Sequence, residues 1–182
     1  QEGIFRHFAT IAEDVDLPMV LYNVPKRTGC DLLPETVARL APLENVVATK
    51  EACGEVARVT AIHEACGAPF PVLSGEDPIN VAMMRAGAVG AISVTANVAP
   101  ARMAAMIDAA LAGDWEMAEA EEAALASLHA AMFVESNPIP VKWALHEMGR
   151  ISTGIRLPLT PLAEPLRAGL RDTLRAYDLL GD

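Results

Sequence analysis

The sequence is short of lysine and of positive charge in general. Only three of its 182 residues are lysine, at positions 26, 50 and 142. Lysine and arginine together number 14 against 24 acidic residues, which gives a formal net charge of -10. Because nucleic-acid binding depends largely on clustered Lys and Arg, this balance argues against a nucleic-acid partner.

Other absences narrow the class of protein further. The three cysteines (Cys30, Cys53 and Cys66) are odd in number and lack C-x-x-C spacing, so we expect reduced thiols of a cytoplasmic protein, with no zinc site and no disulfide framework. No apolar run approaches the roughly 18 residues of a membrane span. The first residues form no signal peptide. They also lack a start methionine, so we expect a processed, trimmed or partial chain.

The few lysines draw attention to Lys50. The run Val46–Lys50 is β-branched and apolar, as in a buried strand, and it ends in this lysine just before a Glu-Ala-Cys-Gly turn. A buried ammonium is costly, and a lysine in a low dielectric loses its proton more readily. A neutral amine can attack a carbonyl to form an imine. From these residues alone two interpretations stay open: a Schiff-base lysine, or a structural pair between Lys50 and a carboxylate.

Four strand-then-helix units follow a first helix at 4–12. The expected strands are 18–23, 46–50, 70–74 and 91–94, and the expected helices between them are 34–41, 54–65 and 78–86. Val24-Pro25 predicts an extended exit from the first strand, Thr28-Gly29 a turn, and Asp77 an N-cap. This order is typical of parallel βαβ structure, and four strands make half of a (β/α)8 barrel.

The rest of the chain shows no strand signal. It predicts helices at 101–112, 115–133, 139–149 and 162–179, separated by proline-rich turns. We therefore expect two regions: residues 1–99 as the C-terminal half of the barrel, and residues 100–182 as a helical region. Chemistry in such barrels lies at the carboxyl ends of the strands, where Tyr22, Lys50, Gly75 and residues 93–95 all fall, and this favours the Schiff-base interpretation of Lys50.

Five motifs in this chain follow one another in a familiar order and spacing. They are Tyr-Asn-Val-Pro-Lys-Arg-Thr-Gly at 22–29, Lys-Glu-Ala at 50–52, Leu-Ser-Gly-Glu-Asp at 73–77, Gly-Ala-Ile-Ser-Val-Thr-Ala-Asn at 90–97 and Asn-Pro-Ile-Pro-Val-Lys at 137–142. Through them essentially the whole chain resembles the dihydrodipicolinate synthase family of pyruvate-dependent Schiff-base lyases.

The resemblance implies a reaction and a set of roles. Pyruvate condenses with aspartate 4-semialdehyde to give 4-hydroxy-tetrahydrodipicolinate, on the diaminopimelate route to lysine. Lys50 forms the imine with pyruvate, Tyr22 relays protons, and Arg27 binds the semialdehyde carboxylate. Gly75 and the backbone around Ile92 line the pyruvate pocket. The resemblance also implies a cytoplasmic homotetramer that needs no metal or organic cofactor.

Two alternatives stay open, and the chain departs from the family pattern in one respect. N-acetylneuraminate lyase and the 2-keto-3-deoxy sugar acid aldolases share the tyrosine and the lysine, but Arg27 favours the semialdehyde. The other alternative is a non-catalytic, truncated paralogue. The family's earlier Thr-Thr-Gly-Glu and Tyr-Tyr-Asn motifs do not occur in this chain. We therefore expect the first four strands to lie outside this sequence, and this chain alone to be inactive.

Overall fold

The computed structural model describes residues 1–180, which form parts of two compact units. The first unit is Gln1–Ile92, and the second begins at Ser93. Each unit has its own set of secondary-structure elements, and each is described by itself below.

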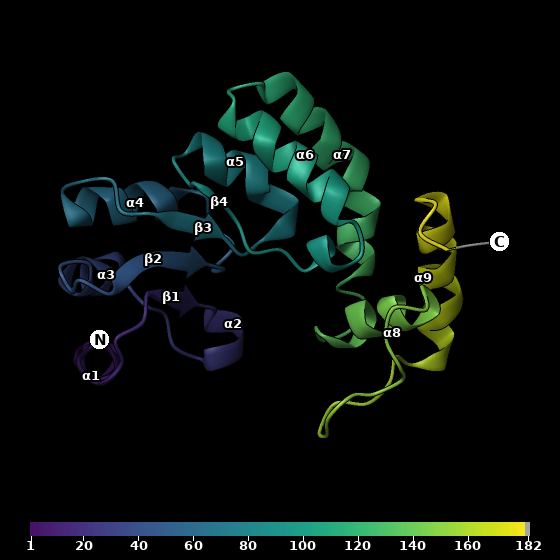
Figure 1. Cartoon of the computed structure of the whole chain (residues 1–182), viewed down its shortest axis with the longest axis horizontal. Helices are drawn as coiled ribbons and strands as arrows, with labels where there is room; N and C mark the ends of the chain where they lie inside the picture. Colours follow the sequence, from purple (N-terminus) through teal and green to yellow (C-terminus); the bar gives the residue numbers. More distant parts are fainter. Residues whose placement is uncertain (181–182) are drawn as a thin grey trace. The chain divides into compact units, whose positions relative to one another are not determined.

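The first unit is built on a parallel sheet of four strands. These are β1 (Met19–Asn23), β2 (Val46–Glu51), β3 (Val72–Ser74) and β4 (Gly90–Ala91), and they lie in the order β1-β2-β3-β4 (Figure 1). The connections carry helices α3 (Pro34–Leu40), α4 (Ala57–Cys66) and α5 (Asn80–Arg85). The predicted α/β class with four successive strand-and-helix units is confirmed.

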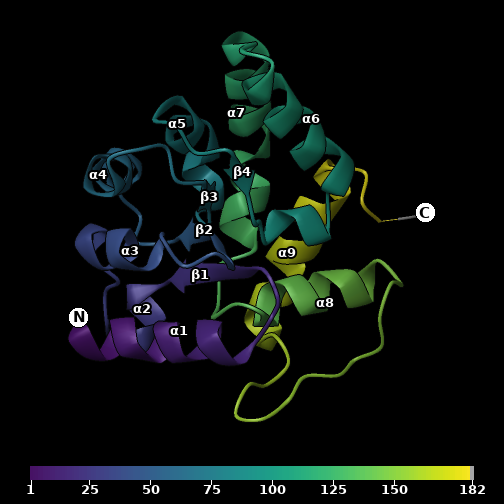
Figure 2. The same cartoon turned by 60° about the vertical axis from the view of Figure 1, so that its left-hand side comes forward.

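Side chains on the two faces of the sheet have very different exposure. On β1, Leu21 and Asn23 are 0% and 2% exposed, whereas Val20 and Tyr22 are 42% and 44% exposed. Successive residues of a strand point to opposite faces, so one face is covered and the other is open. Helix α1 (Glu2–Asp14) lies alongside α3 (Figure 2). Lys50 is the register partner of Tyr22 and therefore lies on the same side of the sheet.

Three local predictions in this region were wrong. Val24 lies outside the helical region (φ -143°, ψ 67°), as a residue before proline should, but a short helix, α2 (Pro25–Thr28), follows at once in place of an extended exit and ends at Gly29, whose φ is +66°. The fourth strand covers only Gly90–Ala91 in place of the expected 91–94, and Val94 has helical angles (φ -75°, ψ -45°). Asp77 is the first residue of the 3-10 helix η1 (Asp77–Ile79), so it is not an N-cap.

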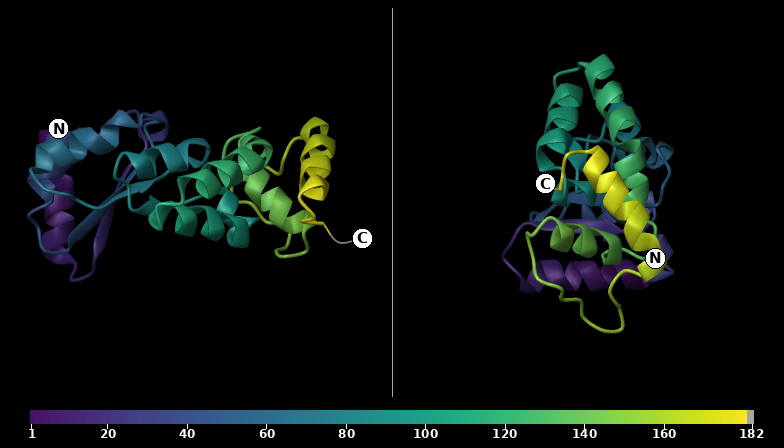
Figure 3. Two further views of the ribbon diagram at one scale, coloured as in Figure 1. Left: turned by 90° about the horizontal axis from the view of Figure 1, so that it is seen from above. Right: turned by 90° about the vertical axis from the view of Figure 1, so that its right-hand side faces the viewer.

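The second unit consists of helices among its described residues. They are η2 (Thr95–Asn97), α6 (Pro100–Leu111), α7 (Trp115–Ala131), α8 (Ile139–Glu147) and α9 (Glu164–Ala176). Helices α6 and α7 lie side by side, joined through Gly113, whose φ is +79° (Figure 3). Asp114 caps α7 by accepting a hydrogen bond from the Met117 N–H at 3.1 Å.

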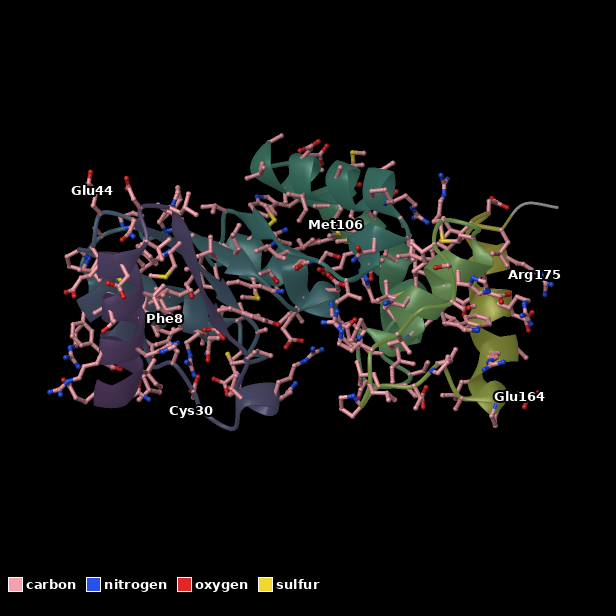
Figure 4. The ribbon with its side chains drawn as sticks, turned by 60° about the horizontal axis from the view of Figure 1, so that its bottom comes forward. Phe8, Cys30, Glu44, Met106, Glu164 and Arg175 are labelled. Carbon is pink, nitrogen blue, oxygen red and sulfur yellow. The ribbon has the colours of Figure 1, made fainter. Side chains whose placement is uncertain are left out.

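The core of this unit is formed mainly by α6 and α7. Met106 on α6, which Figure 4 labels, and Leu125 and Leu128 on α7 are all 0% exposed. Within this core the Thr95 hydroxyl and Nδ1 of the buried His129 are 2.8 Å apart and share a hydrogen bond, which ties η2 to α7. None of the helices among residues 1–180 combines the length and the apolar character needed to cross a membrane.

Candidate active site

The carboxyl ends of the four strands bring most of the predicted site residues to one edge of the sheet. Tyr22 on β1 is the register partner of Lys50 on β2. The Gly75 N–H donates to the Glu51 carbonyl at 2.8 Å, and the Ile92 N–H donates to the Ser74 carbonyl at 2.8 Å. The backbone ladder therefore continues past the strands and holds Tyr22, Lys50, Gly75 and Ile92 along one line.

Lys50 and Tyr22 are in contact on the open face of the sheet. The Lys50 ammonium nitrogen, Nζ, lies 4.3 Å from the centroid of the Tyr22 ring. A cation at this distance from an aromatic face is attracted by the ring quadrupole. Lys50 is half-buried, while Tyr22 is exposed. A small carbonyl compound can therefore approach the amine and the phenol from the same side.

Charge and burial act on Lys50 in opposite directions. Burial is the largest influence and lowers the pKa of Lys50 below its ordinary value, and the nearby Arg27 charge lowers it further. Asp77 and Glu76 act against this shift, because their negative charges favour the ammonium. The net result is a lowered pKa, so the neutral amine forms at a lower pH than in an ordinary lysine.

Gly75 leaves the space that the Lys50 side chain occupies. A Cβ atom added at Gly75 would lie 2.9 Å from Cε of Lys50, 2.9 Å from Cβ of Ala52 and 3.1 Å from the Glu51 carbonyl oxygen. Atoms do not approach so closely without one of them moving. The glycine therefore matters here for its missing side chain. The Ile92 side chain, on the next strand end, is 43% exposed.

Arg27 lies on α2, at the same carboxyl end of β1. The N–H groups of Arg27 and Thr28 donate to the Val24 carbonyl at 2.9 and 3.1 Å, and the Thr28 hydroxyl donates to the Cys30 carbonyl at 2.8 Å. Arg27 itself is exposed. Its influence on the pKa of Lys50 shows that the two cations are within electrostatic reach of one another.

A buried polar cluster behind the site was not predicted as a set. Asn23 Nδ2 donates to Glu51 Oε1 at 2.9 Å and to Asp31 Oδ1 at 2.8 Å. Arg58 on α4 donates to both carboxylate oxygens of Asp31, at 3.0 and 2.8 Å. The sequence gives little signal for such a cluster, because Asp31 and Arg58 are 27 residues apart and Asn23 and Glu51 are 28 apart.

Glu51 also makes a contact with the backbone just after its own strand. Its Oε1 accepts a hydrogen bond from the Cys53 N–H, at 2.8 Å. Burial raises the pKa of Glu51, and burial together with the Glu51 charge raises the pKa of Cys53 to about 11. Cys53 is therefore a protonated thiol near neutral pH and a poor nucleophile.

The fold and these groups define an α/β protein with a lysine-centred site at the carboxyl edge of a parallel sheet. The same chain matches the model of the dihydrodipicolinate synthetase family over residues 1–177. It therefore belongs to that family, as the five sequence motifs predicted.

Individual relatives agree with the family assignment. The 4-hydroxy-tetrahydrodipicolinate synthase of Alcanivorax borkumensis is 55% identical over 180 residues, which is 99% of this chain and 61% of the relative. The enzyme of the same name from Pseudomonas aeruginosa is 53% identical over 177 residues, covering 95% of this chain and 61% of the relative. The chain thus spans about three-fifths of the length of the curated relatives it matches.

Comparison with solved structures also agrees with the family assignment. The chloride-inhibited dihydrodipicolinate synthase from Acinetobacter baumannii, complexed with pyruvate, matches with a TM-score of 0.94 and 50% identity over 98% of this chain and 62% of its own. The dihydrodipicolinate synthase from Aquifex aeolicus matches with a TM-score of 0.95 and 39% identity over 100% of this chain and 62% of its own. The backbone described above is therefore close to that of known synthases.

Proposed function

We propose that this chain supplies the imine-forming lysine of a 4-hydroxy-tetrahydrodipicolinate synthase, a class I aldolase-type lyase. The observation that carries the proposal is the pairing of Lys50 and Tyr22: an amine with a lowered pKa lies 4.3 Å from the centroid of a phenol ring, on the open face of a parallel sheet. The substrates would be pyruvate, with which the related structure from A. baumannii is complexed, and aspartate 4-semialdehyde, as the resemblance of the sequence motifs implies.

The proposed reaction begins at Lys50. Its neutral Nζ attacks the keto carbon of pyruvate, and loss of water leaves a protonated imine. The imine withdraws electrons, so the pyruvate methyl group loses a proton and becomes a nucleophilic enamine carbon. This carbon attacks the aldehyde of the second substrate. The amino group of that substrate then attacks the imine carbon, closes the ring and releases Lys50.

Tyr22 and Arg27 take separate parts in this scheme. The Tyr22 hydroxyl moves protons during imine formation and cyclisation, because a phenol can both donate and accept one. Arg27 holds the carboxylate of the semialdehyde with the two parallel hydrogen bonds that a guanidinium can make. Gly75 and the backbone at Ile92 line the pocket that holds pyruvate. The presence of an arginine at position 27, within the Pro-Lys-Arg-Thr-Gly motif, supports the semialdehyde over a sugar acid.

The active unit in this proposal is larger than this chain. The sheet would be the second half of a (β/α)8 barrel, since Val20, Tyr22 and Ile92 are more than 40% exposed where the other strands of a barrel would pack. The portion of the relatives outside the match would supply the Thr-Thr-Gly-Glu and Tyr-Tyr-Asn motifs. A cytoplasmic homotetramer belongs to the same proposal. We define the completed barrel as this chain preceded by the unmatched portion of the A. borkumensis relative.

Borohydride reduction in the presence of pyruvate tests the proposal directly. The completed barrel should acquire a covalent pyruvate adduct that peptide mapping locates at Lys50, and Lys50→Arg should abolish it. The other two lysines provide matched controls, because Lys26→Arg and Lys142→Arg should keep the adduct. This chain alone should not turn over both substrates. An unmodified Lys50 in the completed barrel, or an adduct that survives Lys50→Arg, would refute the proposal.

A further inference from the structure

Helix α2 is connected to the sheet at both of its ends, although its exposed side chains are free to face a substrate. The segment from Val24 to Cys30 makes its hydrogen bonds mainly within itself, from the N–H groups of Arg27, Thr28 and Gly29 back to Val24 and Pro25. Figure 4 labels Cys30 in this loop. The position of the loop therefore depends on the residues at its two ends, Asn23 and Asp31.

Asn23 holds both ends of the loop at once. Its Nδ2 donates to Asp31 Oδ1 at 2.8 Å, and its Oδ1 accepts from the Leu32 N–H at 3.0 Å. Asn23 is 2% exposed, so these bonds are shielded from water. An amide has two N–H donors and one oxygen acceptor, and Asn23 uses all of these on Asp31, Leu32 and Glu51.

Two further side chains connect this closed loop to neighbouring elements. Glu51 directly follows Lys50 on β2 and is 1% exposed. Its two carboxylate oxygens accept hydrogen bonds from Asn23 Nδ2 at 2.9 and 3.0 Å. Arg58, whose side chain is 12% exposed, forms the two-bond pair with Asp31 from the first turn of α4. A guanidinium and a carboxylate joined by two parallel bonds have a fixed relative orientation.

The pKa shifts of Asp31 and Arg58 agree with the two-bond pair between them. Hydrogen bonding to Arg58 is the main reason that the pKa of Asp31 is lowered, and the same pair raises the pKa of Arg58. Asp31 is therefore ionised at neutral pH, and the pair is charged on both sides. The Gln1 amide adds a hydrogen bond to the Asp31 carbonyl at 2.7 Å.

We propose that Asn23, Asp31, Glu51 and Arg58 are positioning residues that hold α2, which carries Arg27, in a fixed position relative to the end of β2, and thereby set the affinity for the carboxylate of the second substrate. This inference rests on the proposed function. None of the four residues touches substrate. They act through Arg27 on one side and through the strand end that carries Lys50 on the other, so their effect falls on the aldehyde substrate more than on pyruvate.

Steady-state kinetics of the completed barrel with Asp31→Asn test this proposal. This substitution removes the charge that Arg58 holds. The KM for aspartate semialdehyde should rise about tenfold to a hundredfold, because a displacement of about 1 Å in a positioning group has effects of that size. The KM for pyruvate and the rate of borohydride trapping should stay within about twofold of the unsubstituted protein.

Two variants of Arg58 keep the test informative if Asp31→Asn yields little folded protein. Arg58→Lys keeps the positive charge but loses the two-bond fork, so it should raise the semialdehyde KM by a smaller factor. Arg58→Ala should lose affinity for the semialdehyde and should regain part of it when guanidinium is added. Glu2→Gln is the matched control, since it removes the Glu2 ion pairs with Arg6 and Arg39 in the same unit, and it should leave both KM values unchanged.

The outcomes separate the two proposals. An unchanged semialdehyde KM in Asp31→Asn and Arg58→Lys would overturn the positioning role. An equal loss for both substrates, with a lower Tm and no guanidinium rescue, would overturn it as well and leave a purely structural cluster. A completed barrel that traps no pyruvate before any substitution would reject the proposed function, and this inference with it.

Discussion

Gly75→Ala should disable Lys50 while leaving the fold intact. The added methyl group would lie 2.9 Å from Cε of Lys50, 2.9 Å from Cβ of Ala52 and 3.1 Å from the Glu51 carbonyl oxygen. Ala52 and the Glu51 carbonyl belong to the backbone ladder at the strand end and have little freedom to move. The flexible Lys50 side chain can move away from the added methyl group, but the contacts with Ala52 and the Glu51 carbonyl remain and must be relieved by a shift of the backbone.

The size of the effect follows from this geometry. Insertion of a methyl group into a well-packed place costs about 1–3 kcal/mol. If the strain is relieved by moving the Lys50 side chain by about 1 Å, imine formation should slow by about a hundredfold. The stability loss should fall within that range, since only the contact with Lys50 can be relieved by a flexible side chain and those with Ala52 and the Glu51 carbonyl cannot.

Single-turnover trapping of pyruvate tests this prediction. Pyruvate and borohydride are added to the completed barrel, and the rate of adduct formation is compared between Gly75→Ala and the unsubstituted protein, with Tm measured on the same samples. Gly169→Ala is the control, because a Cβ there meets nothing within 4 Å. If Gly75→Ala traps pyruvate at the unsubstituted rate, the space beside Lys50 does not determine its reactivity, and the reasoning from the glycine is refuted.

Two further predictions concern charge and packing. Glu76→Gln removes a negative charge that favours the Lys50 ammonium, so the pKa of Lys50 should fall further, and the rise of trapping rate with pH should move to lower pH; a shift to higher pH would contradict the electrostatic argument. In the second unit, Leu125→Ala removes a side chain that is 0% exposed and should lower the free energy of unfolding by about 2–5 kcal/mol in urea titrations. Leu111→Ala, at a position 60% exposed, should change it by no more than about 0.5 kcal/mol, and equal losses in the two variants would contradict the assigned core.

The sequence was sufficient to predict the sheet and the residues along its carboxyl edge. Parallel strands place their carboxyl ends side by side, so identifying the strands of Tyr22 and Lys50 was enough to bring these two residues together. The buried cluster is different. Asp31, after α2, and Arg58, in the first turn of α4, are 27 residues apart and meet only in the folded chain, and no local pattern encodes that contact.

The local errors have physical causes of their own. Val94 is β-branched and favours a strand, but the Ser93 hydroxyl accepts a hydrogen bond from the Ala96 N–H at 2.9 Å and turns the chain there. For α2 the signals were present: Pro25 is at the first helical position and Gly29 has the left-handed conformation typical of a helix end. Val24 precedes a proline and therefore favours extended angles, and this preference led to the prediction of an extended segment instead of a helix.

The register between β1 and β2 limits how this chain can change in length during evolution. Tyr22 and Lys50 face one another because the two strands are paired without a shift from Val20 to Asn23. Because side chains alternate between the faces, inserting or deleting one residue between Ala48 and Lys50 would turn Lys50 to the covered face and present Thr49 or Glu51 in its place. Descendants that keep the chemistry can therefore gain or lose residues in the connections at the opposite edge of the sheet, but not between Ala48 and Lys50, where the strands pair without a shift.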